Sequence, residues 1–191
     1  MDEVKRFTLL ITVLIFFGCN GDKSYIPKPP TFLKIELEDR TYKDYVSDCN
    51  FKFTKPDYFN PKKAQHGTCN LDIDFMRHNG TLHLSFIKMD TTLSAYVNYA
   101  IDKVDEHKVK ATAIKDTNFI NTSNNAYGTF FELQGNVASP FQFYLTDSTD
   151  HFMSGVVYFN ARPNYDSIRP VLNYVKDDLY KLMETFAWEE E

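Results

Sequence analysis

The sequence lacks an excess of positive charge. Its 21 Lys and Arg residues are outnumbered by 26 Asp and Glu residues, which gives a net charge of -5 at pH 7. Nucleic-acid-binding domains carry a basic patch or stripe, so this composition does not favour nucleic acid as a partner. The balance is typical of a mildly acidic soluble protein, and 191 residues fit one ordinary domain.

Sequence motifs for several common chemistries are also missing. The chain has no Gly-rich phosphate loop and no β-α-β alternation. No two of its histidines have the spacing of metal ligands on a helix; they are His66, His78, His83, His107 and His151. Asp74 and His83 form the nearest constellation, for which a surface ion pair is expected. We therefore predict no metal and no cofactor.

The N-terminal apolar run is too short to cross a membrane as a helix. Phe7–Phe17 has eleven residues, which span about 16 Å against the roughly 30 Å of a bilayer core. Two basic residues precede the run, and a Gly-Cys pair follows it. This order predicts a lipoprotein signal peptide over residues 1–18, with Cys19 as the lipidated residue. A plain secretory signal with a coincidental cysteine is the alternative.

Lipidation at Cys19 divides the rest of the chain into a tether, residues 19–31, and a single domain, residues 32–191. Three prolines stiffen the tether: Pro27, Pro29 and Pro30. Two or more acyl chains, such as palmitate with a diacylglyceryl group, anchor a protein stably. The expected location is the cell envelope, facing the periplasm and held in the membrane by the lipid. The choice between inner and outer membrane stays open.

Two further cysteines, Cys49 and Cys69, lie in the mature chain. Outside the cytoplasm such a pair tends to form a disulfide, and closing a loop of this length stabilises by about 3 kcal/mol. Two free buried thiols are an alternative, and a metal site is disfavoured because the neighbouring sequence offers only His66 as a further ligand.

Alternating and helical periodicities divide the domain into strands and helices. Strands are expected at 31–39, 49–55, 69–88 as a hairpin, 109–116, 128–135, 140–147 and 151–160, with 55–68 as a loop. One helix is expected over 91–110, with Thr91 or Thr92 as its N-cap. A second helix is expected to begin after an N-cap at Asp166 or Ser167 and to extend to Phe186. This order predicts an α+β fold, with a mostly antiparallel sheet of about six to eight strands covered by two main helices, including a long C-terminal amphipathic helix.

The clearest hairpin signal is the Asn79-Gly80 pair between two alternating runs. Asn-Gly favours a two-residue turn, which predicts that His78 pairs with Thr81 and Phe75 with Leu84. The same register places Ile73 opposite Phe86 and brings the apolar residues to one face.

The stretch Asp147–His151 contains the residue types of a hydrolytic triad. We interpret it as a four-residue hairpin loop that pairs Thr146 with His151, in which Asp147 forms an Asx-turn. A hydrolase that uses Ser148 and His151 is a rival hypothesis, but a triad needs a rigid surround and an oxyanion hole. We expect no catalytic residue there.

The chain resembles the gliding motility lipoprotein GldD family of Bacteroidetes. Residues 135–188 carry most of the likeness. Its most specific parts are the segment LTDST, residues 145–149, followed by His151, and the segment FNARPN, residues 159–164, followed by Ser167. The family pattern also resembles this chain at four other places. They are the sequences around Cys49 and Cys69, residues 80–86, and the lipoprotein signal. The resemblance implies a role in gliding and in type IX secretion, with other envelope proteins as partners, and it implies no enzymatic activity.

We expect the C-terminal hairpin and its exit to contact the partner, through Asp147, His151, Asn160, Arg162, Pro163 and Asn164. The alternative function is a periplasmic glycan- or small-ligand-binding module that uses the high aromatic content, which is 16%. Such a module requires a concave, aromatic-lined pocket. Three Asp-Ser/Thr segments also resemble the O-glycan acceptor pattern of Bacteroidetes periplasmic proteins, with Ser148, Thr91 and Ser167 as acceptors.

Overall fold

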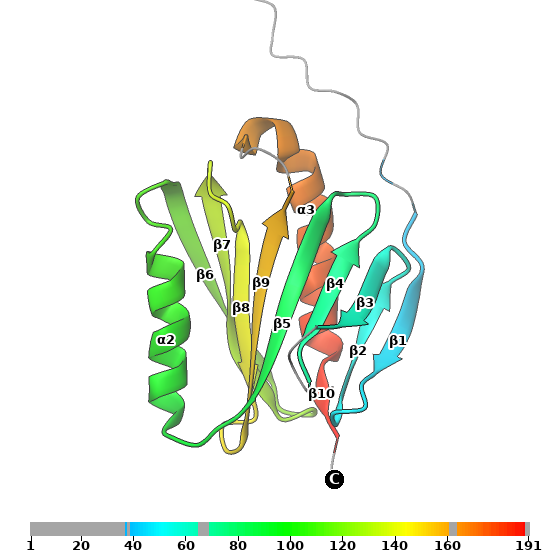
Figure 1. Cartoon of the computed structure of the whole chain (residues 1–191), viewed down its shortest axis with the longest axis vertical. Helices are drawn as coiled ribbons and strands as arrows, with labels where there is room; N and C mark the ends of the chain where they lie inside the picture. The colour runs from blue at the N-terminus through cyan, green and yellow to red at the C-terminus, as the bar shows by residue number, and fades with distance from the viewer. Residues whose placement is uncertain (1–36, 38, 65–68, 161–163, 190–191) are drawn as a thin grey trace, which may run out of the picture. The chain divides into compact units, whose positions relative to one another are not determined.

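The computed structural model describes residues 37, 39–64, 69–160 and 164–189, all within the compact unit Leu33–Glu191. Its main element is a seven-stranded antiparallel sheet in the order β3-β4-β5-β9-β8-β7-β6 (Figure 1). The strands are β3 (Phe59–Lys63), β4 (Leu71–Phe75), β5 (Gly80–Lys88), β6 (Ala111–Asn121), β7 (Ala126–Gly135), β8 (Phe141–Thr146) and β9 (His151–Phe159). The predicted α+β fold is confirmed.

A smaller sheet and two helices complete the described fold. The smaller sheet has the order β1-β2-β10, with β1 (Tyr42–Val46), β2 (Phe51–Pro56) and β10 (Ala187–Trp188). Helix α3 (Tyr165–Thr185) packs against β2 and passes behind β5 and β9 in Figure 1. Helix α2 (Leu93–Asp105) packs beside β8.

The alternation of side chains gives the large sheet two different faces. One face, called here the core face, carries Phe143 and Leu145 of β8 and packs with α3 and β2 around the main hydrophobic cluster. The opposite face, called the α2 face, carries Phe131 and Leu133 of β7, which pack with Val104 of α2 in a smaller cluster. The sheet is therefore covered by α3 and the small sheet on one side and partly by α2 on the other.

The two helices differ in how much of their predicted apolar stripe they bury. Most of the stripe of α3 is buried: Val171, Leu172, Val175, Leu179, Leu182 and Met183. In α2 only Val104 is buried, because the helix covers only part of the α2 face of the sheet. The cap of α3 differs from the expectation: Asn164 holds that position, and its carbonyl accepts the N–H groups of Ser167 and Ile168. Thr92 is the N-cap residue of α2.

The β4–β5 hairpin has a different register from the predicted one. Phe75 pairs with Gly80 and Ile73 with Leu82, so the loop has four residues rather than two. Asn79 adopts a left-handed backbone with φ 48° at the end of this loop, where Asn is tolerated. Gly80 is the first strand residue, and a Cβ there would lie 2.9 Å from the ring of Phe75. The Asn-Gly pair marks the turn correctly, but packing of Gly80 sets the register.

The small sheet and the edge strand β3 were only partly predicted. Residues 59–63 of the expected loop form β3, whose Pro61 pairs with Ile73. Proline is tolerated on an edge strand because its missing N–H faces away from the sheet. Of the expected strand at 31–39, Leu37 and Asp39 are described and lie outside any strand, and the other residues lie outside the described part of the chain.

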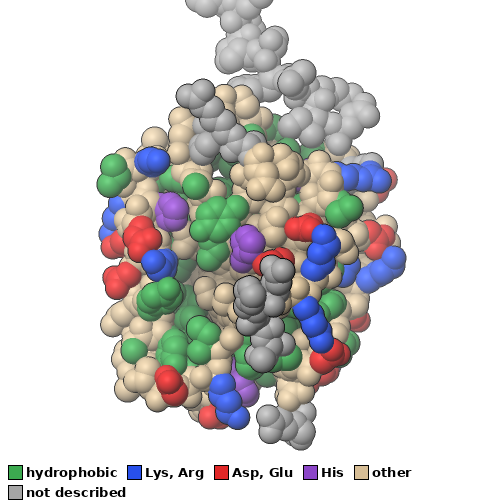
Figure 2. Space-filling model, viewed as in Figure 1, with side chains coloured by type: hydrophobic (Ala, Val, Ile, Leu, Met, Phe, Trp, Pro, Cys, Tyr) green, Lys and Arg blue, Asp and Glu red, His purple; other side chains and the backbone are tan. Residues whose placement is uncertain are grey.

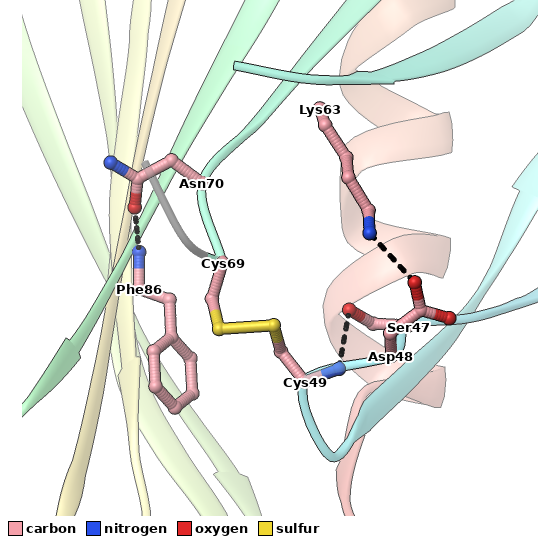
Figure 3. The surroundings of a disulfide bond; sticks show 7 residues. All are labelled: Ser47, Asp48, Cys49, Lys63, Cys69, Asn70 and Phe86. Carbon is pink, nitrogen blue, oxygen red and sulfur yellow. Dashed lines mark hydrogen bonds and ion pairs between the residues drawn. A yellow bond between two sulfur atoms is a disulfide. The ribbon is translucent and has the colours of Figure 1, made fainter. Parts of the chain in front are cut away.

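A disulfide joins the two sheets. Cys49 lies in the β1–β2 connection and Cys69 lies just before β4, with a Cα–Cα distance of 5.7 Å (Figure 3). The N–H of Phe86 in β5 donates to the side chain of Asn70, the residue after Cys69, at 2.9 Å. The disulfide therefore connects a turn of the small sheet to the start of β4, near the β3 edge of the large one.

Candidate functional site

The loop between β8 and β9 is organised by the carboxylate of Asp147. Its Oδ1 accepts the backbone N–H groups of Thr149, Asp150 and His151, each at 2.9 Å, and its Oδ2 lies 2.6 Å from His151 Nδ1. Burial by itself raises the pKa of Asp147, but the hydrogen bonds outweigh burial and hold the pKa below its usual value. The predicted Asx-turn is confirmed, and Asp147 uses its acceptor capacity within the turn.

The register of the β8–β9 hairpin is shifted by one residue from the predicted pairing. Thr146 pairs with Phe152, and Phe143 pairs with Gly155. The Thr146 hydroxyl donates to the His151 carbonyl at 2.7 Å, so His151 closes the loop rather than facing Thr146 as a strand partner. A Cβ at Gly155 would lie 2.3 Å from the Phe143 ring. The aromatic ring therefore requires glycine opposite it, which fixes the register.

Ser148 and His151 are not arranged as a nucleophile and its base. Ser148 has φ 71° at the exposed tip of the loop, and no hydrogen bond joins its hydroxyl to His151 among the described residues. The His151 ring stacks on Trp188, with centroids 5.3 Å apart, and also contacts Phe86. The geometry supports a structural turn rather than a hydrolytic site.

The expected partner-contact residues fall at the two ends of β9. Asp147 and His151 lie at its start, whereas Asn160 and Asn164 follow its end. Nine strand residues separate the two groups by about 30 Å. Asn160 bonds with the β4–β5 loop, since its N–H donates to the Asn79 carbonyl and its carbonyl accepts from Asn79 Nδ2, both at 2.7 Å. Arg162 and Pro163 lie outside the described residues.

A buried carboxylate in α3, Asp178, is the centre of a polar cluster that links three elements. Its side chain is 0% exposed. The hydroxyls of Tyr42 from β1 and Tyr58 from the β2–β3 turn donate to it at 2.7 and 2.5 Å. Arg40 Nε lies 3.2 Å from Asp178 Oδ1, an ion pair without the alignment of a hydrogen bond. Two donors and one cation thus compensate the buried charge.

The surroundings of the two tyrosines in this cluster keep their hydroxyls protonated. Burial, together with the hydrogen bond to Asp178, raises the pKa of Tyr42 to about 12. The same causes raise the pKa of Tyr58. Both phenols are therefore neutral donors at physiological pH. Arg40 also donates to the Tyr174 carbonyl at 2.8 Å and lies 4.2 Å from the centroid of the Tyr174 ring, so the segment before β1 is bound firmly to α3.

Sequence reasoning missed this cluster, although the sequence carries a signal for it. Asp178 lies three residues after Val175 and four before Leu182, on the apolar stripe of α3. Residues at this spacing share a helix face. A carboxylate on a buried face needs partners, but nothing in the local sequence identifies Arg40, Tyr42 or Tyr58.

Residues 22–188 match the family model of the gliding motility lipoprotein GldD. The chain belongs to this family. No curated protein matches it. Membership in the GldD family associates the chain with gliding motility and with a membrane-anchored location in the cell envelope. Along the described part of this GldD-family chain, none of the helices has the length and apolar character of a membrane span.

The described residues of this GldD-family domain line at least two surface hollows. One, of about 440 Å³, opens beside the Asp178 cluster and is lined by Arg40, Tyr58, Arg77, His78 and other residues. The His78 ring meets Tyr58 edge to face at 4.9 Å, and burial lowers the pKa of His78. The other hollow, of about 420 Å³, lies between α2 and the α2 face of the sheet.

Metal-ligand geometry does not occur in the described residues. They contain no group of three or more His, Cys, Asp or Glu side chains that could hold a metal ion. His83 pairs with Asp72 at 2.6 Å rather than with Asp74, because the observed register places Asp72 directly opposite. The proposed O-glycan acceptors Ser148, Thr91 and Ser167 are all exposed.

Proposed function

We propose that this GldD-family protein is a non-enzymatic, lipid-anchored subunit on the periplasmic side of the envelope. In this proposal its folded domain binds other envelope proteins and supports the assembly or stability of the gliding and type IX secretion machinery. The observation that carries the proposal is the family match, which begins at residue 22, three residues after the expected lipidated Cys19.

The tether gives the domain reach from the membrane. Its thirteen residues, 19–31, include three prolines, and an extended proline-rich chain rises about 3.1 Å per residue. In this proposal thirteen residues in that extended form would span roughly 40 Å. This reach allows the domain to meet partners that project from the same membrane.

The Asp178 cluster suits a domain that is held by its N-terminus. Arg40 follows the tether by nine residues and binds Asp178 and Tyr174 of α3. A pull on the lipid anchor reaches the domain through this segment. The ion pair of Arg40 and the hydrogen bond of Tyr42 resist the peeling of β1 and the segment before it from α3, because breaking them removes partners from a buried carboxylate.

Of the two ends of β9, we propose the end at Asn160 as the partner-contact surface. Both Asn160 and Asn164 are exposed there, and amide side chains provide donors and acceptors for a partner. At the opposite end Asp147 already accepts four polar contacts within its own loop. We therefore assign Asp147 and His151 a role in shaping the hairpin.

The anchor proposal is tested with Cys19→Ala in the native host. We expect this variant to lose incorporation of a palmitate analogue, to leave the membrane fraction, and to fail to restore type IX secretion and spreading in a deletion strain. Ser24→Ala, in the same tether, is the matched control and should behave as the parent chain. Membrane retention and full complementation by Cys19→Ala, or a deletion strain that secretes and spreads normally, would contradict the proposal.

Ligand binding is a second candidate function, favoured by one specific observation. The hollow beside α2 has about 420 Å³ and tyrosine side chains in its lining. This volume lies within the range of small-molecule sites. The concave, aromatic-lined pocket that a glycan- or small-ligand-binding module requires is therefore available.

A further inference from the structure

A groove, called here the α2 groove, lies between helix α2 and strands β5, β8 and β9. Its lining includes Tyr99 and Lys103 of α2, Gln142 of β8, and Ser154 and Tyr158 of β9. In Figure 2 hydrophobic side chains gather at the left of the molecule, over α2 and the neighbouring strands, beside a hollow. The groove lies between two contacts of α2 with the sheet: Val104 packs against Phe131 and Leu133, and the Tyr96 ring contacts Phe152 with centroids 5.5 Å apart.

An unsatisfied amide lies in the lining of this groove. Gln142 is only 5% exposed, and its Nε2 has no hydrogen-bond partner among the described residues. Buried polar groups in folded proteins are nearly always paired, and an unpaired donor lowers stability. The amide on the α2 face therefore needs an acceptor that the described residues do not supply. A ligand oxygen in the groove meets that need.

The remaining lining indicates the chemistry of the ligand. Tyr99 and Tyr158 are 60% and 40% exposed, so their ring surfaces are open to a flat apolar group. The Ser85 and Ser154 hydroxyls add donors and acceptors. The main cation, Lys103, lies 5.5 Å from the centroid of the Tyr99 ring and pairs with Glu106 at 2.7 Å. The groove therefore offers flat surfaces and hydrogen bonds with little net charge.

We propose that the α2 groove binds a neutral saccharide. Sugar rings combine an apolar C–H face, which packs on tyrosine, with hydroxyl groups that exchange hydrogen bonds with amides and serines. In this assignment a sugar oxygen accepts from Gln142 Nε2, and Tyr158 forms a wall against the ring. The inference deepens the ligand-binding candidate and does not depend on the anchor or on the partner contact at Asn160.

Replacement of the Gln142 amide is expected to raise stability and to weaken saccharide binding, and a purely structural role would not produce both effects. Gln142→Met keeps the length of the side chain and removes the unpaired donor. We expect the variant without ligand to unfold about 2 °C higher than the parent chain, and to bind saccharide about tenfold more weakly. Gln134→Met in β7, outside the groove, is the matched control and should leave binding unchanged.

The assay uses the full lipidated protein in a zwitterionic detergent without a sugar headgroup. Calorimetric titration with N,N′,N″-triacetylchitotriose and with cellotriose provides neutral probes, and glucose 6-phosphate provides a charged one. We expect at least one neutral probe to bind, glucose 6-phosphate to bind more weakly, and Tyr158→Ala to reduce saccharide binding about tenfold. Tyr127→Ala, outside the groove, is the control for removing a tyrosine ring.

Three results would overturn the proposal. They are no heat of binding with either neutral trisaccharide, tighter binding of glucose 6-phosphate than of both, and saccharide binding that survives both Gln142→Met and Tyr158→Ala. Tyr158 is partly exposed, so its variant tests the groove even if replacement of the buried Gln142 impairs folding. Loss of saccharide binding would leave the secretion phenotype of Cys19→Ala unchanged, so the two proposals fail independently.

Discussion

Replacing Asp178 with alanine removes the carboxylate on which the polar cluster depends. The substitution leaves the hydroxyls of Tyr42 and Tyr58 without their acceptor and leaves Arg40 without its buried counter-charge. Because Asp178 is fully buried, water does not reach the vacated position freely. We expect the segment before β1 to detach from α3, and the domain to lose a large part of its stability.

The contacts set the size of this loss. Hydrogen bonds to a charged group contribute about 1.5–3 kcal/mol each, and removing one partner of a buried ion pair costs about 3–5 kcal/mol. Arg40 is 25% exposed and regains some hydration, so we expect the free energy of unfolding to fall by about 3–4 kcal/mol. For a domain of this size that corresponds to a decrease in Tm of about 6–16 °C.

Thermal and urea unfolding of the purified protein measure this loss, with the fluorescence of the single tryptophan, Trp188, as one probe. The neighbouring residue supplies the matched control. Asp177 is 61% exposed and lies 3.4 Å from the same Arg40. Exposed ion pairs contribute about 0–1 kcal/mol. Asp177→Ala should therefore leave Tm nearly unchanged, although it removes the same charge from the same turn of α3.

Two results would refute this reasoning. One is an equal loss of stability in Asp177→Ala and Asp178→Ala, which would mean that net charge matters and burial does not. The other comes from an apolar replacement of the whole cluster, with Arg40→Met, Tyr42→Phe, Tyr58→Phe and Asp178→Leu. This variant removes all four polar side chains of the cluster together, so none of them is left buried without a partner, and it should unfold at a higher temperature than Asp178→Ala. A lower Tm would show that unpaired polar groups are not the cause.

Three further predictions concern other parts of the fold. Because the pKa of Asp147 is lowered in the folded state, its carboxylate stabilises the fold above about pH 4, the ordinary Asp value, and this stability is lost as the pH falls through the folded pKa. Asp147→Asn should therefore flatten the acid side of a plot of urea midpoint against pH. An unchanged slope would contradict the assignment. Replacing both Cys49 and Cys69 with alanine should lower the free energy of unfolding by about 3 kcal/mol, and reductant should then have no further effect. Gly155→Ala should destabilise by about 1–3 kcal/mol, because its Cβ would overlap the Phe143 ring; unfolding at the parent temperature would disprove that packing.

The sequence predicted the class of the fold and the position of most elements. Periodicity located α2, α3 and strands β4 to β9, because the face that each element buries is recorded in the spacing of its apolar residues. The Asp147 turn was also predicted, since an Asx-turn is formed by residues two to four positions apart. These features depend on neighbours along the chain.

The registers of the two hairpins and the Asp178 cluster were decided by tertiary structure. A glycine that must lie under an aromatic ring, as Gly80 and Gly155 do, sets strand pairing through contacts that alternation alone does not specify. The partners of Asp178 are separated from it by more than a hundred residues. The α2 groove likewise exists only because the helix and strands β5, β8 and β9 come together in the fold. Local periodicity determines which residues are buried, whereas the close packing of distant segments determines which of them meet.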